Sequence, residues 1–341
     1  MLGSRPEVIQ AAPVSRALDA RVSEILVNTG QHYDWAMDQG QVLDVALRQP
    51  DYNLEVGSRP DEEQLEIACG RISEVIRHER PDLVLVRGDT NSTLAGARAG
   101  AFCGVPVVHV EAGLRSFRDD MPEERNRVET DSIAQVLCAP TPAAQSNLDR
   151  EGVAGATYLT GDVLYDLLVV MRARLQPAQE AKPYALATIH RNYNTDDDDR
   201  LAAALDCLGA VPYRVVFLAH PRTRRRLEEQ RFAIPSNVEL REPVTYLRML
   251  ELERDAQVIL TDSGGVQREA YAWGTRCITL REETEWVETV EAGWNFVVGL
   301  DRDAVAEALE APLPDAHPPV FGDGFAAQRI ADIVLDRLGG R

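Results

Sequence analysis

The sequence contains almost no lysine. Lys182 is the only one, so nearly all of the 36 basic residues are arginine, and 55 acidic residues bring the net charge to −19. So large a negative charge argues against nucleic acid and anionic membranes as partners, because both attract basic surfaces. An acidic, lysine-poor surface suits a salt-rich cytoplasm, where screening relieves self-repulsion, but a genome that prefers arginine codons would produce the same bias.

Cysteines and long apolar runs are also scarce. The five cysteines are scattered singly, with no CxxC pair and no Cys/His cluster, so neither a disulfide framework nor a zinc site is indicated. No apolar run approaches the roughly 20 residues that a membrane span needs, and no basic-then-apolar leader is visible. The acidic run Asp196–Asp199 is more typical of a solvated loop than of a metal site. We therefore expect a cytoplasmic protein without a metal.

Short apolar runs alternate with longer amphipathic ones along the chain. Val/Ile/Leu-rich strands alternating with helices indicate parallel sheets covered on both faces, which is an α/β fold. The expected strands are 25–28, 83–87, 107–110, 136–139, 157–160, 185–189, 215–219, 238–240, 258–261, 277–280 and 296–298. The length favours two domains at roughly 100–200 residues per domain, and we expect both to be doubly wound and to face a cleft.

The alternation pauses at 168–183, which contains two prolines and is interpreted as a helix and linker. The segment Gly3–Glu7 resembles a turn that follows a first strand, although only Met1 and Leu2 precede it. We therefore expect the natural chain to begin several residues earlier.

A glycine turn follows the expected strand at 258–261. Ser263, Gly264 and Gly265 stand between this strand and an expected helix. Free amides at a helix N-terminus favour an anion such as a diphosphate, and glycine lets the backbone approach it closely. A helix cap formed by Ser263 is the structural alternative. Glu269, one helical turn later, could accept ribose hydroxyls or lie on the surface.

Three acidic residues follow the expected strands of the first half. Asp89 and Glu111 stand at the carboxyl ends of two consecutive strands, and Glu123 follows within a dozen residues. Positioned carboxylates are the groups that general acid–base chemistry needs. Helix capping is the commoner role for an Asp such as Asp89. In the second half, His190 and His220 each end a strand beside an arginine, and together they suggest a rim that faces phosphate.

In this order the motifs GSRPE, TGQH, RGDTNST, HVEAGLRS, MPEERNR, HRNYN, AHPRT, TDSGGVQREA and LREETEW resemble the non-hydrolysing UDP-N-acetylglucosamine 2-epimerase family, from Gly3 to about Val298. The resemblance implies two Rossmann-like domains of the GT-B type, spanning 1–167 and 168–325, and a final helix at 326–341 that packs back on the first. It implies a homodimer without cofactor and an isomerase that supplies a precursor for polysaccharide biosynthesis. The implied reaction interconverts UDP-N-acetylglucosamine and UDP-N-acetylmannosamine by anti elimination of UDP, giving 2-acetamidoglucal, and re-addition.

The resemblance also implies roles for individual residues. Asp89, Glu111 and Glu123 match the active-site acids, and His190 matches a nucleotide-binding histidine, which we count with the catalytic group. The expected substrate and UDP contacts are Arg5, Gln10, His220, Tyr246, Met249, Ser263, Gly264, Gly265, Glu269 and Arg281. Gln10 stands where the family has a lysine, and Met249 stands where it has an aromatic residue that stacks on uracil. Gln31, His32 and Gln64 match positions of a regulatory substrate site.

Other functions stay open at this point. The stretch Thr284–Glu288 departs from the TERPE pattern, so a modified UDP-sugar such as a diacetamido uronic acid is one alternative substrate. A hydrolysing epimerase would release UDP and the free sugar, and a glycosyltransferase would need an acceptor. A regulator would bind a UDP-sugar without turnover.

Overall fold

The computed structural model describes residues 1–30, 45–118 and 120–339, with the side chain of Arg5 outside the description. Tertiary contacts divide the chain into two compact units. Unit 1 comprises Met1–Val170 and Pro319–Arg341, and unit 2 comprises Met171–Pro318. The boundaries drawn from the sequence fall after residues 167 and 325, whereas the contacts change after Val170 and Pro318.

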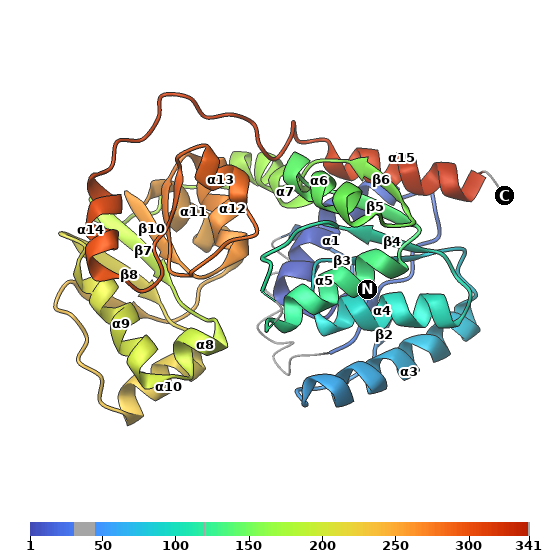
Figure 1. Ribbon diagram of the computed structural model, residues 1–341, viewed down its shortest axis with the longest axis horizontal. Coiled ribbons are helices and arrows are strands. Elements are labelled where there is room, and N and C mark those ends of the chain that lie inside the picture. Colours follow the sequence, from blue (N-terminus) through green and yellow to red (C-terminus); the bar gives the residue numbers. More distant parts are fainter. Residues whose placement is uncertain (31–44, 119, 340–341) are drawn as a thin grey trace. The chain divides into compact units, whose positions relative to one another are not determined.

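Unit 1 is built on short parallel strands covered by helices (Figure 1). Strands β3, β4, β5 and β6 form a sheet in that order, and β1 pairs with β2. The elements are α1 (Arg5–Leu18), β1 (Val27–Asn28), β2 (Tyr52–Asn53), α3 (Asp61–Glu79), β3 (Val84–Arg87), α4 (Asn91–Phe102), β4 (Val107–Val110), α5 (Pro122–Ile133), β5 (Val136–Ala139), α6 (Pro142–Glu151), β6 (Ala156–Leu159), α7 (Val163–Met171) and α15 (Ala326–Gly339).

Unit 2 contains a six-stranded parallel sheet in the order β12-β11-β10-β7-β8-β9. This is the strand order of a doubly wound Rossmann fold, with β7 and β10 at the centre where the order reverses. The elements are η1 (Arg172–Arg174), β7 (Tyr184–Thr188), α8 (Asn192–Thr195), α9 (Asp198–Gly209), β8 (Arg214–Leu218), α10 (Pro221–Glu229), β9 (Val238–Arg241), α11 (Tyr246–Asp255), β10 (Val258–Thr261), α12 (Gly264–Trp273), β11 (Arg276–Thr279), α13 (Val287–Glu291), β12 (Asn295–Val297) and α14 (Arg302–Glu310).

The strands form where apolar residues run without interruption. All four residues of β4, β5 and β10 are buried, because helices cover both faces of a parallel sheet. The expected α/β fold is therefore confirmed, and each strand expected from the sequence lies within two residues of an observed one. Only β2, which has two residues, was not expected.

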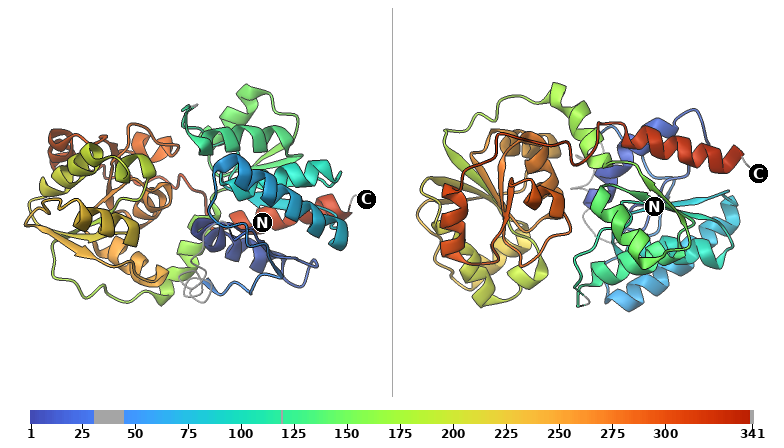
Figure 2. Two further views of the ribbon diagram at one scale, coloured as in Figure 1. Left: turned by 90° about the horizontal axis from the view of Figure 1, so that it is seen from below. Right: turned by 45° about the horizontal axis from the view of Figure 1, so that its top comes forward.

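The last helix of the chain belongs to unit 1. Buried residues Ala327, Ile330 and Val334 of α15 pack in one cluster with Val14 and Leu18 of α1. This helix lies along unit 1 in each view (Figures 1 and 2). The buried carboxylate of Asp166 on α7 accepts the Ala327 N–H at 2.6 Å, and burial raises the pKa of this carboxyl. Asp166 thus acts as the N-terminal cap of α15 from a distant part of the chain.

Replacing Asp166 by alanine should loosen α15. Loss of a capping acceptor costs about 1–2 kcal/mol, and the fully buried amide would lose its partner. Hydrogen exchange of α15 peptides, followed by mass spectrometry, should become faster in Asp166→Ala. Asp332→Ala is the matched control, because Asp332 is an exposed residue of the same helix whose contacts with Arg21 and Gln328 lie at the surface. Equal exchange in both variants would contradict the capping role.

Among the described residues, no helix is long and apolar enough to cross a membrane. Within the same residues, no group of three or more His, Cys, Asp or Glu side chains is arranged to hold a metal ion.

Candidate active site

Asp89 and Glu111 lie at one edge of the unit 1 sheet. Strands β3 and β4 pair in parallel with Arg87 opposite Val110, so the residues that follow both strands emerge at the same edge. The backbone turns sharply there: Glu111 has φ 71°, although it is not a glycine, and Gly88 has φ 70°. A left-handed non-glycine residue costs about 1–3 kcal/mol and is common at functional sites. The geometry therefore supports a functional role for Glu111.

Helix α5 brings Glu123 toward Asp89. Arg127 of α5 forms an ion pair with the Asp89 carboxylate, and the Asn126 side chain donates to the Asp89 carbonyl oxygen at 2.9 Å. Glu123 is one helical turn before Arg127 and shares its face of the helix. The three expected acids are thus placed around one sheet edge.

The neighbouring Glu124 has a different task. It is buried and accepts hydrogen bonds from Ser116 N–H at 2.8 Å and Ser116 Oγ at 2.9 Å, and it pairs with Arg127 at 3.0 Å. With its oxygens engaged in this way, Glu124 fastens the loop after β4 to α5. Of the two adjacent glutamates, only Glu123 is partly exposed and suited to meet a substrate.

A buried ionic network supports the two turns that carry Asp89 and Glu111. His109 Nδ1 contacts Asp131 Oδ1 at 2.6 Å, and His109 Nε2 contacts the carbonyl oxygen of Gly88, next to Asp89, at 2.9 Å. Both partners accept, so both ring nitrogens of His109 donate. Asp131 also accepts the Gly113 N–H at 3.0 Å and pairs with Arg115 at 2.8 Å. The network was not expected from the sequence, and it holds the backbone on either side of the candidate acids.

A chain of amide side chains connects Gln64 with the Asp89 turn. Asn91 donates to Gln64 Oε1 at 2.8 Å, and Asn126 donates to Asn91 Oδ1 at 3.1 Å as well as to Asp89 O. Gln64 itself donates to Gly57 O at 2.9 Å and is buried. Gln31 and His32, the other expected regulatory residues, lie outside the described residues.

The start of α1 is held by Glu7. Its carboxylate accepts the N–H groups of Gly3 and Ser4 at 2.8 and 2.7 Å and the hydroxyl of Thr90 at 2.8 Å. The bond from the Ser4 N–H is the Glu7 half of a capping box, because Ser4 is the N-cap of α1 and Glu7 its third residue. Gln10, one turn later, is buried. The side chain of Arg5 lies outside the described part of the chain, so its expected nucleotide contact stays a prediction.

In unit 2, the expected phosphate turn begins α12. Ser263 caps the helix, accepting the Val266 N–H. A β-carbon on Gly264 would lie 2.5 Å from Oε1 of Glu285, so a larger residue would force the Glu285 side chain to shift. Cap and anion site are compatible, because the cap uses the Val266 amide and leaves the first amides of the helix directed outward.

Three of the residues expected around the nucleotide, Tyr246, Met249 and Glu269, are buried in unit 2. Tyr246 donates to Glu269 Oε1 at 2.8 Å, and both side chains are buried. Met249 is buried in the hydrophobic cluster beneath α11 and α12. Tyr246 thus orients the carboxylate that the resemblance assigns to the ribose, while Met249 packs within the protein.

Arg281 is wholly buried after β11. Its Nη2 pairs with Glu285 at 2.8 Å and with Glu283 at 3.2 Å, while Nε and Nη1 have no hydrogen-bond partner among the described residues. Burial would lower the pKa of Arg281, but Glu285 and other neighbouring groups raise it. A charged guanidinium with unsatisfied donors is suited to an anionic ligand.

The two histidines differ in their surroundings. His190 follows β7, is half exposed, and contacts the buried Asp262 through Nδ1 at 3.1 Å. His220 caps α10, and its Nδ1 accepts the Arg222 N–H at 3.2 Å. The cap was not expected, and it occupies Nδ1 of His220.

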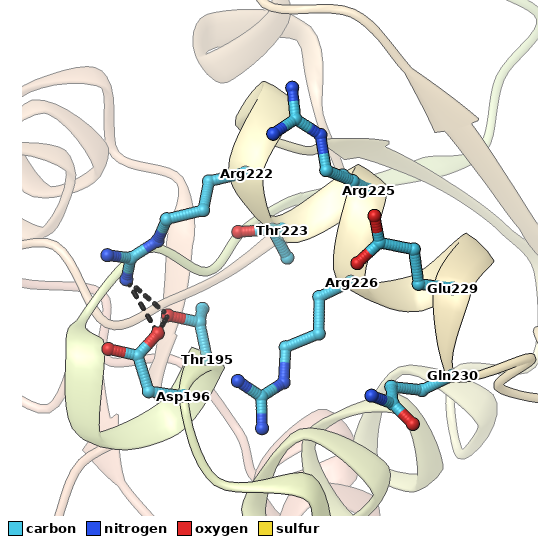
Figure 3. Close-up of a pocket in the computed structure, with 8 residues that line it drawn as sticks. All are labelled: Thr195, Asp196, Arg222, Thr223, Arg225, Arg226, Glu229 and Gln230. Atoms are coloured by element: carbon cyan, nitrogen blue, oxygen red, sulfur yellow. Dashed lines mark hydrogen bonds and ion pairs between the residues drawn. The ribbon is translucent and has the colours of Figure 1, made fainter.

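A pocket lies between the end of α8 and helix α10 (Figure 3). Arg222 reaches across it and donates to Asp196 at 2.8 Å and to Thr195 at 3.2 Å. Its lining contains none of the expected site residues and consists of Thr195, Asp196, Arg222, Thr223, Arg225, Arg226, Glu229 and Gln230. We interpret it as a structural junction that ties α8 to α10.

Comparisons with known proteins agree with this arrangement. A family model described as UDP-N-acetylglucosamine 2-epimerase matches residues 16–335. A UDP-N-acetylglucosamine 2-epimerase homolog of Methanococcus maripaludis is 41% identical, with 98% of each chain covered. The UDP-2,3-diacetamido-2,3-dideoxy-D-glucuronate 2-epimerase of Pseudomonas aeruginosa is 40% identical, with 97% of each covered. The crystal structure of the Methanocaldococcus jannaschii UDP-GlcNAc 2-epimerase in complex with UDP-GlcNAc and UDP superimposes with a TM-score of 0.91 at 38% identity, covering 98% of each chain. The chain therefore belongs to the UDP-N-acetylglucosamine 2-epimerase family of carbohydrate isomerases.

Proposed function

We propose that the protein interconverts UDP-N-acetylglucosamine and UDP-N-acetylmannosamine by inverting carbon 2. The observation that carries the proposal is the set of three acids around one sheet edge, with Glu111 in a left-handed conformation and Asp89 paired with Arg127. The relative from M. jannaschii, whose structure contains UDP-GlcNAc and UDP, supports this substrate.

In this mechanism a carboxylate removes the weakly acidic proton at carbon 2 while UDP departs from carbon 1. The resulting 2-acetamidoglucal is protonated on its other face, and UDP adds back. Asp89, Glu111 and Glu123 provide the acid–base groups, since positioned carboxylates lower the barrier to proton transfer. Retaining both fragments makes re-addition effectively intramolecular.

The nucleotide is assigned to unit 2. The amides of Gly264 and Gly265 at the start of α12 bind the diphosphate, and Arg281 and His190 add hydrogen-bond donors. Glu269, oriented by Tyr246, accepts the ribose hydroxyls. We further propose that Arg5, Gln10, Met249 and His220 contribute to substrate binding. We also propose that the protein is a cytoplasmic homodimer supplying polysaccharide biosynthesis.

The reaction is tested by incubating the protein with UDP-N-acetylglucosamine in deuterated water and following carbon 2 by proton NMR. We expect UDP-N-acetylmannosamine that carries deuterium at carbon 2. Free N-acetylmannosamine and UDP would instead indicate a hydrolysing enzyme. If UDP-N-acetylglucosamine stays unchanged, the proposed substrate is rejected. The diacetamido uronic acid named for the P. aeruginosa relative is then the next substrate to test. Binding of UDP without turnover of either sugar would identify a non-catalytic binding protein.

A further inference from the structure

Asp262 directly follows β10, and both oxygens of its carboxylate bind the segment that carries His190. Oδ1 accepts the His190 N–H at 3.0 Å and lies 3.1 Å from the His190 Nδ1. Oδ2 accepts the Arg191 N–H at 3.0 Å and the Asn194 side-chain amide at 3.1 Å. The residue is fully buried. No role was assigned to it from the sequence, although it lies inside the TDSGG motif.

The topology of unit 2 brings these residues together. Strands β7 and β10 pair in parallel with Thr188 opposite Thr261, so Asp262 emerges beside the residues that follow β7. The two threonine hydroxyls are 2.7 Å apart and join the strand ends. The contact between Asp262 and His190 therefore depends on the central strand pair of the sheet.

Residues of other elements also bind the segment that follows β7 and carries His190. Asn194 donates to Leu280 O at 3.2 Å and accepts two hydrogen bonds from Arg200 at 3.2 and 3.0 Å. Arg222 of α10 donates to Thr195, as Figure 3 shows. The backbone around His190 is thus fixed, while the imidazole remains half exposed.

The protonation state of the ring follows from this contact. Burial alone would raise the pKa of Asp262, but the adjacent His190 and the N–H donors of Arg191 and Asn194 lower it to about 2. An ionised carboxylate beside Nδ1 requires a proton on that nitrogen, which leaves Nε2 directed away from Asp262. When Nδ1 donates to Asp262 and Nε2 donates to an anionic oxygen of a ligand, the carboxylate balances the positive charge of the ring.

We propose that Asp262 is a positioning residue for His190. It fixes the orientation of the imidazole and keeps a proton on Nδ1, so that Nε2 is directed at the diphosphate of the nucleotide while the carboxylate balances the charge of a ring that donates from both nitrogens. The identity of the ligand rests on the proposed function, whereas the orientation and the proton on Nδ1 do not.

The substitution Asp262→Asn separates the proposal from a purely structural role, in which Asp262 only anchors the backbone and the ring of His190 stays unchanged. Under the proposal the ring changes, for the following reason. The carboxamide has one acceptor oxygen, which the Arg191 N–H and the Asn194 amide occupy. Its NH2 group then faces His190 Nδ1, which has to accept, so the proton moves to Nε2 and the ring becomes neutral. The same substitution beside a catalytic histidine changes the tautomer in serine proteases.

The first experiment is nitrogen-15 NMR of the histidine rings in the full chain without ligand. The His190 signals are assigned by their loss in His190→Gln. In the unsubstituted protein we expect a proton on Nδ1, and in Asp262→Asn we expect a neutral ring protonated on Nε2. A ring protonated only on Nε2 in the unsubstituted protein would overturn the proposal, and this measurement does not depend on whether the variant folds. An unchanged ring in a folded variant would also overturn it.

The second experiment is calorimetric titration with UDP. Asp262→Asn should bind UDP about tenfold more weakly, because a ring without an adjacent carboxylate donates a weaker hydrogen bond to the diphosphate. Asp196→Asn is the control: Asp196 is exposed in the same region and pairs with Arg222, so its affinity should stay within twofold. Equal affinities in both variants would overturn the proposal. If the unsubstituted protein does not bind UDP, the proposed function fails while the NMR result still decides the role of Asp262.

Discussion

Glutamine in place of Glu111 should lower kcat for epimerisation by about 10²–10⁴-fold, the usual contribution of a positioned acid or base. The substitution keeps the shape of the side chain and removes its ability to carry the proton, while the sheet edge that places it stays intact. Steady-state kinetics with UDP-N-acetylglucosamine measures the effect, and KM should change much less than kcat because the nucleotide contacts lie elsewhere.

Entry of solvent deuterium tells which face of carbon 2 Glu111 serves. A variant that lacks the base for one epimer should no longer exchange the carbon 2 proton of that epimer with solvent deuterium. It should still exchange the carbon 2 proton when the reaction starts from the other epimer. Glu129→Gln is the matched control, since Glu129 lies on α5 and pairs with Arg98 at the protein surface. A kcat for Glu111→Gln within threefold of the unsubstituted protein would remove Glu111 from the proton transfer.

Asparagine in place of Asp131 should destabilise the protein by about 3–5 kcal/mol, the usual cost of breaking a buried ion pair from one side. His109 would be left buried without its carboxylate partner, Arg115 would keep only Glu151, and the Gly113 amide would lose an ionic acceptor. Scanning calorimetry should show a lower unfolding temperature. Asp149→Asn on the exposed face of α6 is the control and should change little.

The same carboxylate predicts how stability changes with pH. Burial alone would raise the pKa of Asp131, but His109 and Arg115 outweigh it and lower that pKa. A lowered pKa means that the contribution is complete above the ordinary aspartate value of about 3.9 and is lost as the pH falls through the lower, folded-state value. The difference in unfolding temperature between Asp131→Asn and the unsubstituted protein should therefore shrink in acid. A constant difference would contradict an ionised Asp131.

The strands could be predicted from the sequence because a parallel sheet buries both faces, and the resulting apolar runs are visible without any structure. Strand β2 could not, since two residues, Tyr52 and Asn53, carry no periodic signal. The discontinuous make-up of unit 1 was expected only through the resemblance, because nothing in the composition of α15 says which sheet it covers.

The candidate site could be predicted only in part. Residues at strand ends, such as Asp89 and Glu111, are visible because their position follows from the strands. The separate tasks of Glu123 and Glu124 depend on helix phase: adjacent residues point about 100° apart, so Glu124 is buried against Ser116 while Glu123 stays partly exposed. Asp131 and Asp262 act through contacts between distant segments, which no local pattern predicts.

The place of α15 in the fold has a consequence for synthesis on the ribosome. Unit 2 is one continuous stretch, so it can complete its sheet while the chain is still being made. Unit 1 emerges first, but the apolar faces of α1, β4 and β5 wait for Ala327, Ile330 and Val334, which are translated only after unit 2. At about 5–20 residues per second, these surfaces stay uncovered for roughly 7–30 s while Met171–Pro318 is translated. We expect this nascent intermediate to be the form of the protein that chaperones recognise.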